Sequence, residues 1–347
     1  MSKTVLHILN TDSFSGAENV VISIICGFRK CSGNDIHFVY VSLDGSIRQV
    51  LQEQNIEFAP VKKLTVGELK RVIREYEPDI LHAHDFTASI ICAAASSKIP
   101  VISHIHNNSP WIRTCCRNSI VYGLSCLRYN KMLGVSESVF DEFVFGKYFR
   151  KKEEIIGNPI DIAGIREKAF HAEDKTPYDV VFLGRLSAPK NPCFFLEIVR
   201  EVCKVKRVRA VMIGDGKLRS EVEQKIEEYG LQDVVDMKGF MKNPYGILAN
   251  SKMLCLPSKW EGFGLAAVEA LALGKPVAAS PVGGIPSIIQ GEEGCLCSTA
   301  KEFSQEIIDM LNDTELYDKR VKMAGERAGQ LDNMKKYIKK IDEIYNG

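Results

Sequence analysis

The sequence has no apolar run that approaches the roughly 18–20 residues a helix needs to cross a bilayer. Its first ten residues, MSKTVLHILN, lead straight into a strand-like segment and lack the apolar core of a secretory signal. Both absences favour a cytoplasmic protein, and in that compartment thiols stay reduced. We therefore expect no disulfide bonds among the 11 cysteines.

The chain also lacks an excess of either charge. Its 45 basic and 44 acidic residues leave a net charge of +1, which is not the basic excess typical of a nucleic-acid-binding protein. Neither Cys115-Cys116 nor Cys295-x-Cys297 has the spacing of a paired zinc site, and no HExxH motif occurs. The sequence predicts neither a nucleic-acid partner nor a metal ion.

Short apolar strands alternate with helix-like segments in both halves of the chain, and 347 residues suit two domains of roughly 150–170 residues each. Such alternation is typical of parallel sheets that helices cover on both faces. The predicted strands are Thr4–Leu9, Ile36–Leu43, Ile56–Val61, Asp79–Ala83, Pro100–Ile105, Lys131–Val135, Tyr178–Leu183, Val208–Ile213, Val234–Met237, Met253–Leu256 and Pro276–Ala279.

The pattern predicts an α/β protein with two Rossmann-like, doubly wound domains that face each other across a cleft. The segment 169–177 is polar and ends in Pro177, so we place the linker there. The predicted domains are then 1–168 and 169–330, followed by a C-terminal helix, 331–347, that packs back on the first domain. Doubly wound sheets bind ligands at the carboxyl ends of their strands, so the loops there are the candidate sites.

The densest candidate site follows the strand Met253–Leu256, where the chain reads WEGFGLAAVEALALGKP. Gly262 and Gly264 let the backbone approach an anion, and a helix that begins near Gly264 presents free N–H groups to it. Glu261 in the loop and Glu269 on the helix would repel a diphosphate unless they bind hydroxyl groups. The motif predicts a phosphate site flanked by hydroxyl groups; the alternative is a helix start with one solvated and one capping glutamate.

A second loop, within FLGRLSAPKNP at 182–192, carries Arg185 and Lys190. Two fixed cations can neutralise a diphosphate without a metal ion; the alternative is solvated surface charge. Gly214 opens a tight turn after the next strand, and Gly16 lies where the first helix begins. Neither glycine belongs to a GxGxxG fingerprint of dinucleotide-binding proteins.

Four of the seven histidines fall at the ends of two strands, His82 and His84 in one and His104 and His106 in the other. Alternation along a strand puts the two members of each pair on the same face. A zinc site is one interpretation, although the sequence offers no third partner such as a cysteine pair. We expect at least one of the four to hydrogen-bond a substrate and the others to be structural.

The blocks FLGRLSAPKNP, IGDGKLRSEVE and EGFGLAAVEALALGKPV, in this order, resemble the retaining glycosyltransferases of GT-B fold, family 4. The match is looser in the first half, where the block at 104–107 (HIHN) is similar to the branch that makes exopolysaccharide, capsule and lipopolysaccharide. The resemblance implies a hexosyltransferase that moves a hexose or N-acetylhexosamine from a nucleotide diphosphate, UDP being the commonest. It implies no cofactor, a saccharide or lipid-linked saccharide acceptor bound by the first domain, and a donor bound by the second.

The resemblance also assigns roles to single residues. Glu261 would bind hydroxyl groups of the donor sugar, and Glu269 those of the ribose. Arg185 and Lys190 would bind the diphosphate, which on leaving helps to deprotonate the acceptor hydroxyl. His106 would face the sugar as the active-site histidine. The other donor-binding positions are Gly16, Gly184, Gly214, Phe240, Phe263, Gly264 and Leu265.

The first-domain loop departs from the family pattern, which often reads Gly-Gly-x-Glu. Ser15 stands where the first glycine would be, at a cost of about 1 kcal/mol if that position needs a positive φ. Gly16 is retained, so we expect a modest shift rather than a loss of phosphate binding.

The segment 110–152 concentrates basic and aromatic residues in an otherwise balanced chain. It carries eight basic against three acidic residues, together with aromatics such as Trp111 and Tyr148. The segment predicts contact with an anionic membrane on its cytoplasmic face, where each basic residue contributes about 1 kcal/mol. The alternative is a solvated face above ordinary core aromatics.

Other functions suit the same motifs. A nucleotide-sugar epimerase or a sugar phosphorylase can be built on this fold, the second with a lysine-bound pyridoxal cofactor. A non-catalytic nucleotide-sugar-binding protein would keep the same pocket without turnover.

Overall fold

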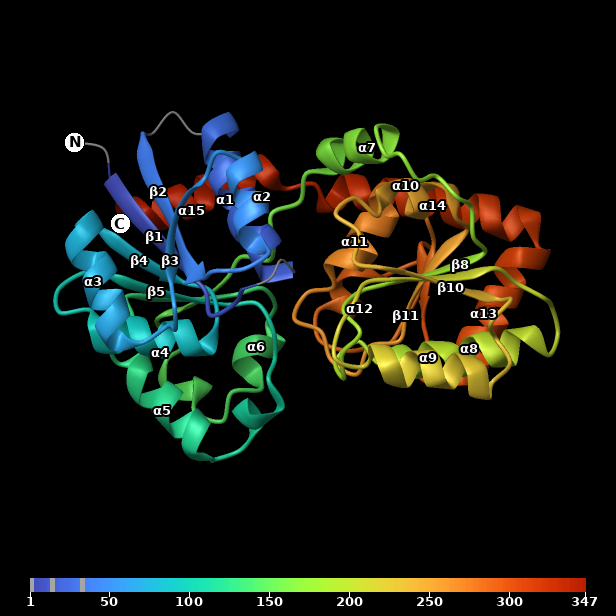
Figure 1. The fold of residues 1–347 in the computed structure, drawn as a ribbon, viewed down its shortest axis with the longest axis horizontal. Helices are drawn as coiled ribbons and strands as arrows, with labels where there is room; N and C mark the ends of the chain where they lie inside the picture. Colours follow the sequence, from blue (N-terminus) through green and yellow to red (C-terminus); the bar gives the residue numbers. More distant parts are fainter. Residues whose placement is uncertain (1–2, 13–15, 32–34) are drawn as a thin grey trace. The chain divides into compact units, whose positions relative to one another are not determined.

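The computed structural model describes residues 3–12, 16–31 and 35–347. The chain divides into two compact units: unit 1 comprises residues 1–159 and 334–347, and unit 2 comprises residues 160–333. Each unit holds one parallel sheet with helices packed on both faces (Figure 1). The predicted fold class, two Rossmann-like α/β domains, is confirmed. No helix within the described ranges is long and apolar enough to cross a bilayer.

The sheet of unit 1 has seven strands in the order β3-β2-β1-β4-β5-β6-β7, all parallel. The strands are β1 (Lys3–Ile8), β2 (Ile36–Leu43), β3 (Glu57–Val61), β4 (Ile80–Ala83), β5 (Val101–Ile105), β6 (Lys131–Gly134) and β7 (Glu153–Ile155). At the centre, Val5 pairs with Phe38 on one side and Ile80 on the other. The edge strand β7 was not predicted because its sequence, Glu-Glu-Ile, contains no apolar run.

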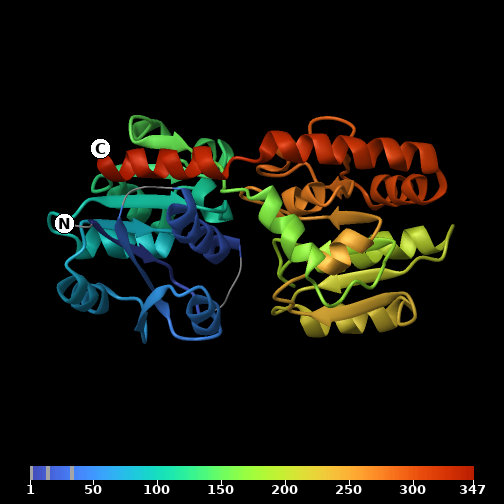
Figure 2. The same ribbon diagram turned by 90° about the horizontal axis from the view of Figure 1, so that it is seen from above.

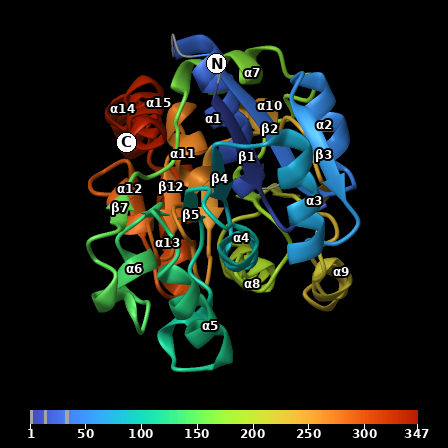
Figure 3. The same ribbon diagram turned by 90° about the vertical axis from the view of Figure 1, so that its left-hand side faces the viewer.

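The helices of unit 1 form a layer on each face of this sheet (Figures 1 and 3). One layer contains α1 (Gly16–Cys31), α2 (Ile47–Glu53) and α15 (Met334–Asn346), and the other contains α3 (Val66–Tyr76), α4 (Phe86–Ala95) and α5 (Arg117–Cys126). Short turns η1 (Pro110–Arg113), α6 (Ser138–Asp141) and η2 (Gly146–Tyr148) complete the unit. Asp85, between β4 and α4, is the N-cap of α4. Its side chain accepts a hydrogen bond from the Ala88 N–H at 2.7 Å.

The sheet of unit 2 has six parallel strands in the order β10-β9-β8-β11-β12-β13. They are β8 (Val180–Leu183), β9 (Ala210–Ile213), β10 (Val235–Gly239), β11 (Met253–Leu256), β12 (Val277–Ala279) and β13 (Gly294–Leu296). One apolar core lies under α8 (Pro192–Cys203), α9 (Arg219–Glu228) and α13 (Ala300–Asn312). The other lies under α7 (Ile162–Phe170), α10 (Tyr245–Asn250), α11 (Leu265–Ala272), α12 (Ile285–Ile288) and α14 (Thr314–Leu331).

The structure divides the chain earlier than the sequence analysis, which placed the boundary at 168/169. The helix α7 belongs to unit 2, because Ile162 and Ile165 pack into one of the apolar cores of that unit. The Arg166 side chain also donates to the carbonyl of Ala272, at 2.9 Å. The polar segment 169–177 is therefore a surface loop within unit 2, since polarity marks an exposed loop whether or not domains meet there.

The last helix, α15, lies beside α1 in unit 1 (Figure 2). Gly27 of α1 gives it room, since a Cβ there would lie 2.6 Å from Cδ1 of Ile338. Ile341 is fully buried. Lys340 forms an ion pair with Glu154 of β7, with 2.5 Å between Nζ and Oε1. Apolar burial along one side of the helix therefore fixes it to this unit.

We predict that Ile341→Ala lowers the free energy of unfolding of unit 1 by about 2–5 kcal/mol, because it leaves a cavity under α15. The control is Lys339→Ala, an exposed position on the same helix, which should change that free energy by less than about 0.5 kcal/mol. Urea denaturation measures both. Equal stabilities for the two variants would contradict the docking of α15 on unit 1.

Candidate functional site

The carboxyl ends of β8 and β11 bring a cation and a carboxylate together in unit 2. Lys190, in the loop after β8, places its Nζ 2.5 Å from Oε1 of Glu261, in the loop after β11. The hydroxyl of Ser258 donates to the same oxygen at 2.8 Å. Glu261 is 7% exposed and Lys190 25%, so each charge is held by the other in a partly desolvated setting. Gly184 lies beside the stem of Lys190, where a Cβ would make an ordinary van der Waals contact at 3.5 Å.

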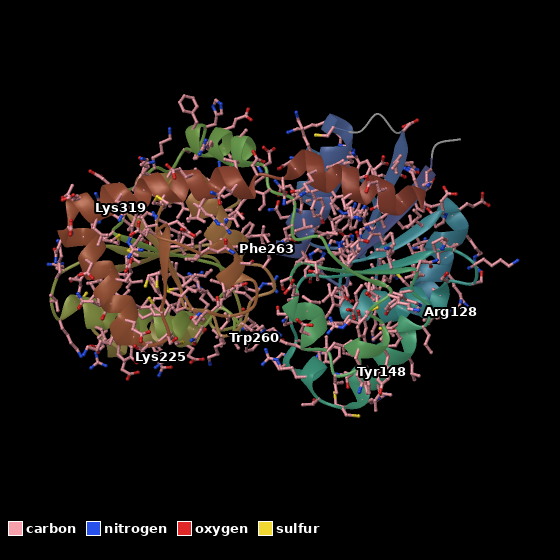
Figure 4. The ribbon with its side chains drawn as sticks, turned by 180° about the vertical axis from the view of Figure 1, so that it is seen from behind. Arg128, Tyr148, Lys225, Trp260, Phe263 and Lys319 are labelled. Carbon is pink, nitrogen blue, oxygen red and sulfur yellow. The ribbon has the colours of Figure 1, made fainter. Side chains whose placement is uncertain are left out.

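Gly264 turns the chain from this loop into α11. Its φ is +102°, and a Cβ would run into the side chain of Ile285. Only glycine satisfies both conditions. Leu265 is the first residue of the helix, so the free N–H groups of its first turn lie at this strand end. Phe263 is partly buried against the apolar core, and Trp260 lies at the same end of unit 2 (Figure 4).

Glu269 lies one helical turn into α11. Its Oε1 accepts a hydrogen bond from the hydroxyl of Tyr245, at 2.9 Å. Burial raises the pKa of Glu269 from its usual 4.5 to about 7, against the opposing effects of the Tyr245 hydrogen bond and the charges of Lys168 and Lys190. Lys190 therefore acts electrostatically on both glutamates that the sequence singled out.

The remaining donor-binding candidates of unit 2 lie at neighbouring strand ends. Gly214, with φ of +136°, donates its N–H to the carbonyl of Gly239 at 2.8 Å and leaves no space for a Cβ beside the carbonyl of Gly184. Phe240 follows β10 and is 58% exposed, an aromatic face open to a ligand. The side chain of Arg185 is exposed and makes no hydrogen bond or ion pair with any residue the structure describes.

The two candidates of unit 1 lie at the ends of its central strands. Gly16 is the exposed first residue of α1, and the loop before it, with Ser15, lies outside the described residues. His106 follows β5 and is partly buried. Burial lowers the pKa of His106 from 6.5 to about 3, against a smaller opposing effect of its hydrogen bond with the Asn158 side chain. His106 is therefore a neutral imidazole at physiological pH.

Five histidines, not four, gather at this strand end. His7 of β1 lies beside His82 and His84 at the carboxyl end of β4, and these lie beside His104 and His106 at that of β5. The ring centroids of adjacent histidines lie 4.1–5.3 Å apart. In one triad, His84, His104 and His106, one nitrogen from each ring lies within 4.8 Å of the other two. The same holds for the triad of His7, His82 and His84.

The contacts within this histidine cluster are hydrogen bonds. His7 Nδ1 lies 2.7 Å from His84 Nε2, and His84 Nδ1 lies 3.0 Å from His106 Nε2. At these distances one ring of each pair donates its N–H to the lone pair of the other. The five rings therefore form a hydrogen-bonded network, and each of the two triads is also a group of side chains that could hold a metal ion.

Several residues of the two strand ends escaped the sequence analysis. Ser258 donates a hydrogen bond to Glu261, and Tyr245 donates one to Glu269. Gly283 and Gly284 pack against the backbone of the Glu261 loop. None has a local signal, because serine, tyrosine and a Gly-Gly pair occur in many loops. The sequence Pro-Val-Gly-Gly after β12 could have suggested a close backbone approach.

Two family models match the chain. The one described as "Glycosyltransferase Family 4" matches residues 14–163, and the one described as "Glycosyl transferases group 1" matches residues 165–327.

Named relatives are similar over most of the chain. The N-acetyl-alpha-D-glucosaminyl L-malate synthase of Bacillus anthracis is 23% identical over 348 residues, which cover 90% of this chain and 89% of that protein. A Campylobacter jejuni protein named GalNAc-alpha-(1->4)-GalNAc-alpha-(1->3)-diNAcBac-PP-undecaprenol alpha-1,4-N-acetyl-D-galactosaminyltransferase is 26% identical, over 80% of this chain and 78% of its own. An uncharacterized glycosyltransferase of Methanocaldococcus jannaschii is 26% identical, and the chain spans only 56% of its length.

Solved structures share the fold. The crystal structure of Anabaena Alr3699/HepE in complex with UDP-glucose matches with a TM-score of 0.84 and 21% identity, over 99% of each chain. The crystal structure of TarM matches with a TM-score of 0.80 and 13% identity, over 100% of this chain and 99% of that one.

We predict that Glu269→Gln stabilises unit 2 increasingly as the pH rises from about 5 to about 8. The native pKa, about 7, exceeds the usual 4.5, so between these values the native state binds more protons than the unfolded chain. The contribution of Glu269 to the free energy of unfolding therefore falls as the pH rises through that window, by up to about 3 kcal/mol. Glutamine resembles the neutral acid and avoids this loss.

Urea denaturation of the wild type and the variant at several pH values measures the difference. Glu227→Gln, at an exposed position on α9, is the control and should stay within about 0.5 kcal/mol of the wild type throughout. A difference between wild type and Glu269→Gln that does not grow with pH would contradict the burial of a neutral Glu269.

Proposed function

Since the chain is a GT-B glycosyltransferase with a Glycosyltransferase Family 4 domain and a glycosyl transferases group 1 domain, we propose that its donor is a UDP-sugar and that it transfers the sugar with retention. The sugar is a hexose or N-acetylhexosamine. The acceptor is a saccharide or lipid-linked saccharide of an exopolysaccharide, capsule or lipopolysaccharide pathway.

The observation that carries the donor site is the grouping of Lys190, Glu261 and Glu269 at the strand ends of unit 2. One cation and two acceptors there suit a diphosphate bordered by hydroxyl groups, and Arg185 adds a second cation without a competing partner among the described residues. Support for uridine comes from the matched Anabaena Alr3699/HepE structures, which are complexes with UDP and with UDP-glucose. Support for a lipid-linked acceptor comes from two Campylobacter jejuni relatives, N-acetylgalactosaminyltransferases whose names include an undecaprenol-linked saccharide.

In the proposed reaction the bond between the anomeric carbon and the diphosphate breaks, and a bond from that carbon to the acceptor oxygen forms on the same face. The proton of the acceptor hydroxyl passes to the leaving diphosphate oxygen. Lys190, Arg185 and the first N–H groups of α11 stabilise the charge that develops on the diphosphate, so no divalent ion is required. Glu261 and His106 position the sugar, and Glu269 the ribose.

The experiment supplies UDP-, GDP- and ADP-sugars with an undecaprenyl-diphosphate saccharide and follows transfer in EDTA. We expect transfer from the UDP-sugar with an unchanged anomeric configuration by NMR. Lys190→Ala and Arg185→Ala should each reduce turnover by about 100-fold or more, because each removes charge stabilisation of the leaving group. Lys319→Ala, on α14 (Figure 4), is the control and should keep wild-type turnover.

An inverted product, or transfer lost in EDTA and restored by Mg²⁺, would overturn the proposed chemistry. Product formed from the donor without any acceptor would favour the epimerase alternative. Near-normal turnover in both alanine variants would remove the role of the two cations.

We further propose that α5 of unit 1 docks on an anionic membrane surface, which would bring the enzyme to a lipid-linked acceptor. The outward side of this helix exposes Ile120, Val121 and Leu124, with Leu127 next to its end. Leu124 is 63% exposed and Leu127 67%, while Ser119, Tyr122 and Cys126 form the buried side.

The charges around α5 are fewer than the sequence count of eight basic residues suggests. Arg113 pairs with Glu142, Arg150 with Asp141 and Lys131 with Glu154. Lys152 donates to three backbone carbonyls, and Arg128 donates to two. Tyr122 and Phe143 belong to the core, not to a surface. What remains for a membrane is Arg117, Lys147 and Lys151, beside exposed Tyr148 (Figure 4).

We predict that the protein floats with vesicles containing phosphatidylglycerol at low salt and not with neutral phosphatidylcholine vesicles. Leu124→Ser with Leu127→Ser should abolish flotation, because the apolar contact is lost. The control is Val205→Ser, which removes a side chain 69% exposed in unit 2 and should leave flotation unchanged. Absence of wild-type binding at low salt would rule out the docking surface.

A further inference from the structure

The two histidine triads of unit 1 have the composition of a transition-metal site. The sequence predicted no metal ion, because neither pair of histidines had a third partner. Folding supplies that partner, since β1, β4 and β5 are neighbours in the sheet. Both triads consist of imidazoles alone. Such a set suits Zn²⁺, Cu²⁺ or Ni²⁺, and not Mg²⁺ or Ca²⁺, which take oxygen ligands.

The triad of His7, His82 and His84 is closed to a metal. All six of its ring nitrogens have a hydrogen-bond partner, the Tyr345 hydroxyl among them. The three side chains are at most 1% exposed. One ligand nitrogen from each ring would require at least two of these hydrogen bonds to be broken in the interior of the unit, which is costly.

The triad of His84, His104 and His106 is easier to convert. His84 Nδ1 and His106 Nε2 lie 3.0 Å apart, close to the separation of about 3.3 Å between two nitrogens bound to a tetrahedral Zn²⁺. His104 Nε2 is buried and has no hydrogen-bond partner among the described residues. His106 is only partly buried. A metal here would replace a single hydrogen bond, the one between His84 and His106.

The second nitrogens of two of these rings are already held by the rest of the cluster. His84 Nε2 lies 2.7 Å from His7 Nδ1, and His104 Nδ1 lies 3.3 Å from His82 Nε2. Histidines that bind a metal almost always place their other nitrogen against such a partner, which orients the ring. Burial also keeps the three rings of the triad neutral, with pKa values below the usual 6.5, so each has a lone pair to offer.

We propose that His84 Nδ1, His104 Nε2 and His106 Nε2 form a binding site for Zn²⁺ or a similar transition-metal ion. The ion takes the place of the proton between His84 and His106, which moves to another ring nitrogen, and water occupies its fourth position. His106 Nε2 is then withdrawn from the donor sugar, so the metal inhibits transfer. The inhibition rests on the proposed function; the binding of the metal does not.

The test titrates the chelator-treated full chain with Co²⁺, a coloured substitute for Zn²⁺, and then displaces it with Zn²⁺. We expect one Co²⁺ per chain with the visible absorption of a four-coordinate site and without the near-ultraviolet band of a cobalt–thiolate bond, which would mark the cysteines. His84→Asn and His106→Asn should each weaken this binding by about 100-fold or more, because each removes one of three ligands.

The controls are His37→Asn and His171→Asn, which remove exposed histidines outside the cluster and should bind Co²⁺ like the wild type. Thermal denaturation establishes which variants are folded, and His106→Asn, after the end of β5, is decisive if the buried His84→Asn is not. Absence of Co²⁺ binding in the wild type, a spectrum with the thiolate band only, or unchanged affinity in His106→Asn would overturn the proposal.

Turnover tests the inhibition. With the donor identified, one equivalent of Zn²⁺ should slow transfer by the wild type by about tenfold or more, because His106 no longer positions the sugar, and EDTA should reverse this. His171→Asn should be inhibited equally. Zn²⁺ binding without loss of turnover would refute the inhibition alone. A wild type that transfers no sugar in EDTA would refute the proposed function and leave the metal result standing.

Discussion

The cost of removing charge from water governs both strand ends of this enzyme. In unit 2 the charges of Lys190 and Glu261 are kept because each neutralises the other within hydrogen-bond distance, while Glu269 lacks such a close cation and is held near neutrality. In unit 1 burial lowers the pKa of all five clustered histidines, so their rings are held in the neutral form. One site is thus built to meet a charged ligand, and the other to hold polar groups without charge.

The Lys190–Glu261 contact also explains how such a site can remain stable before a ligand arrives. A diphosphate that engages Lys190 would take over the role of the carboxylate, and Glu261 would then be released toward hydroxyl groups. The carboxylate still has Ser258 as a donor, so it does not become an isolated buried charge. Binding of this kind would exchange one set of compensated charges for another.

Most of the sheet strands could be predicted from the sequence, because parallel strands buried on both faces leave continuous apolar runs such as Phe38–Val41. The edge strands β7 and β13 could not, since edge position and short length relax that requirement. The loops with Arg185, Lys190 and Glu261 stood out because glycine, charge and helix starts coincide there. Ser258 and Tyr245 did not stand out, and neither did the hydrogen bond between the Tyr345 hydroxyl and His82. Contacts between residues distant in sequence leave no local pattern.

The return of α15 to unit 1 has a consequence for how the protein is made. Residues 160–333 are synthesised before the helix that covers α1, so the first unit leaves the ribosome with an apolar face of α1 still bare. Unit 2 can fold as soon as its own residues emerge, whereas unit 1 waits for the end of the chain. The unit that is synthesised first is thus completed last. The histidine cluster then gains the hydroxyl of Tyr345 on α15, which lies 2.7 Å from His82 Nδ1.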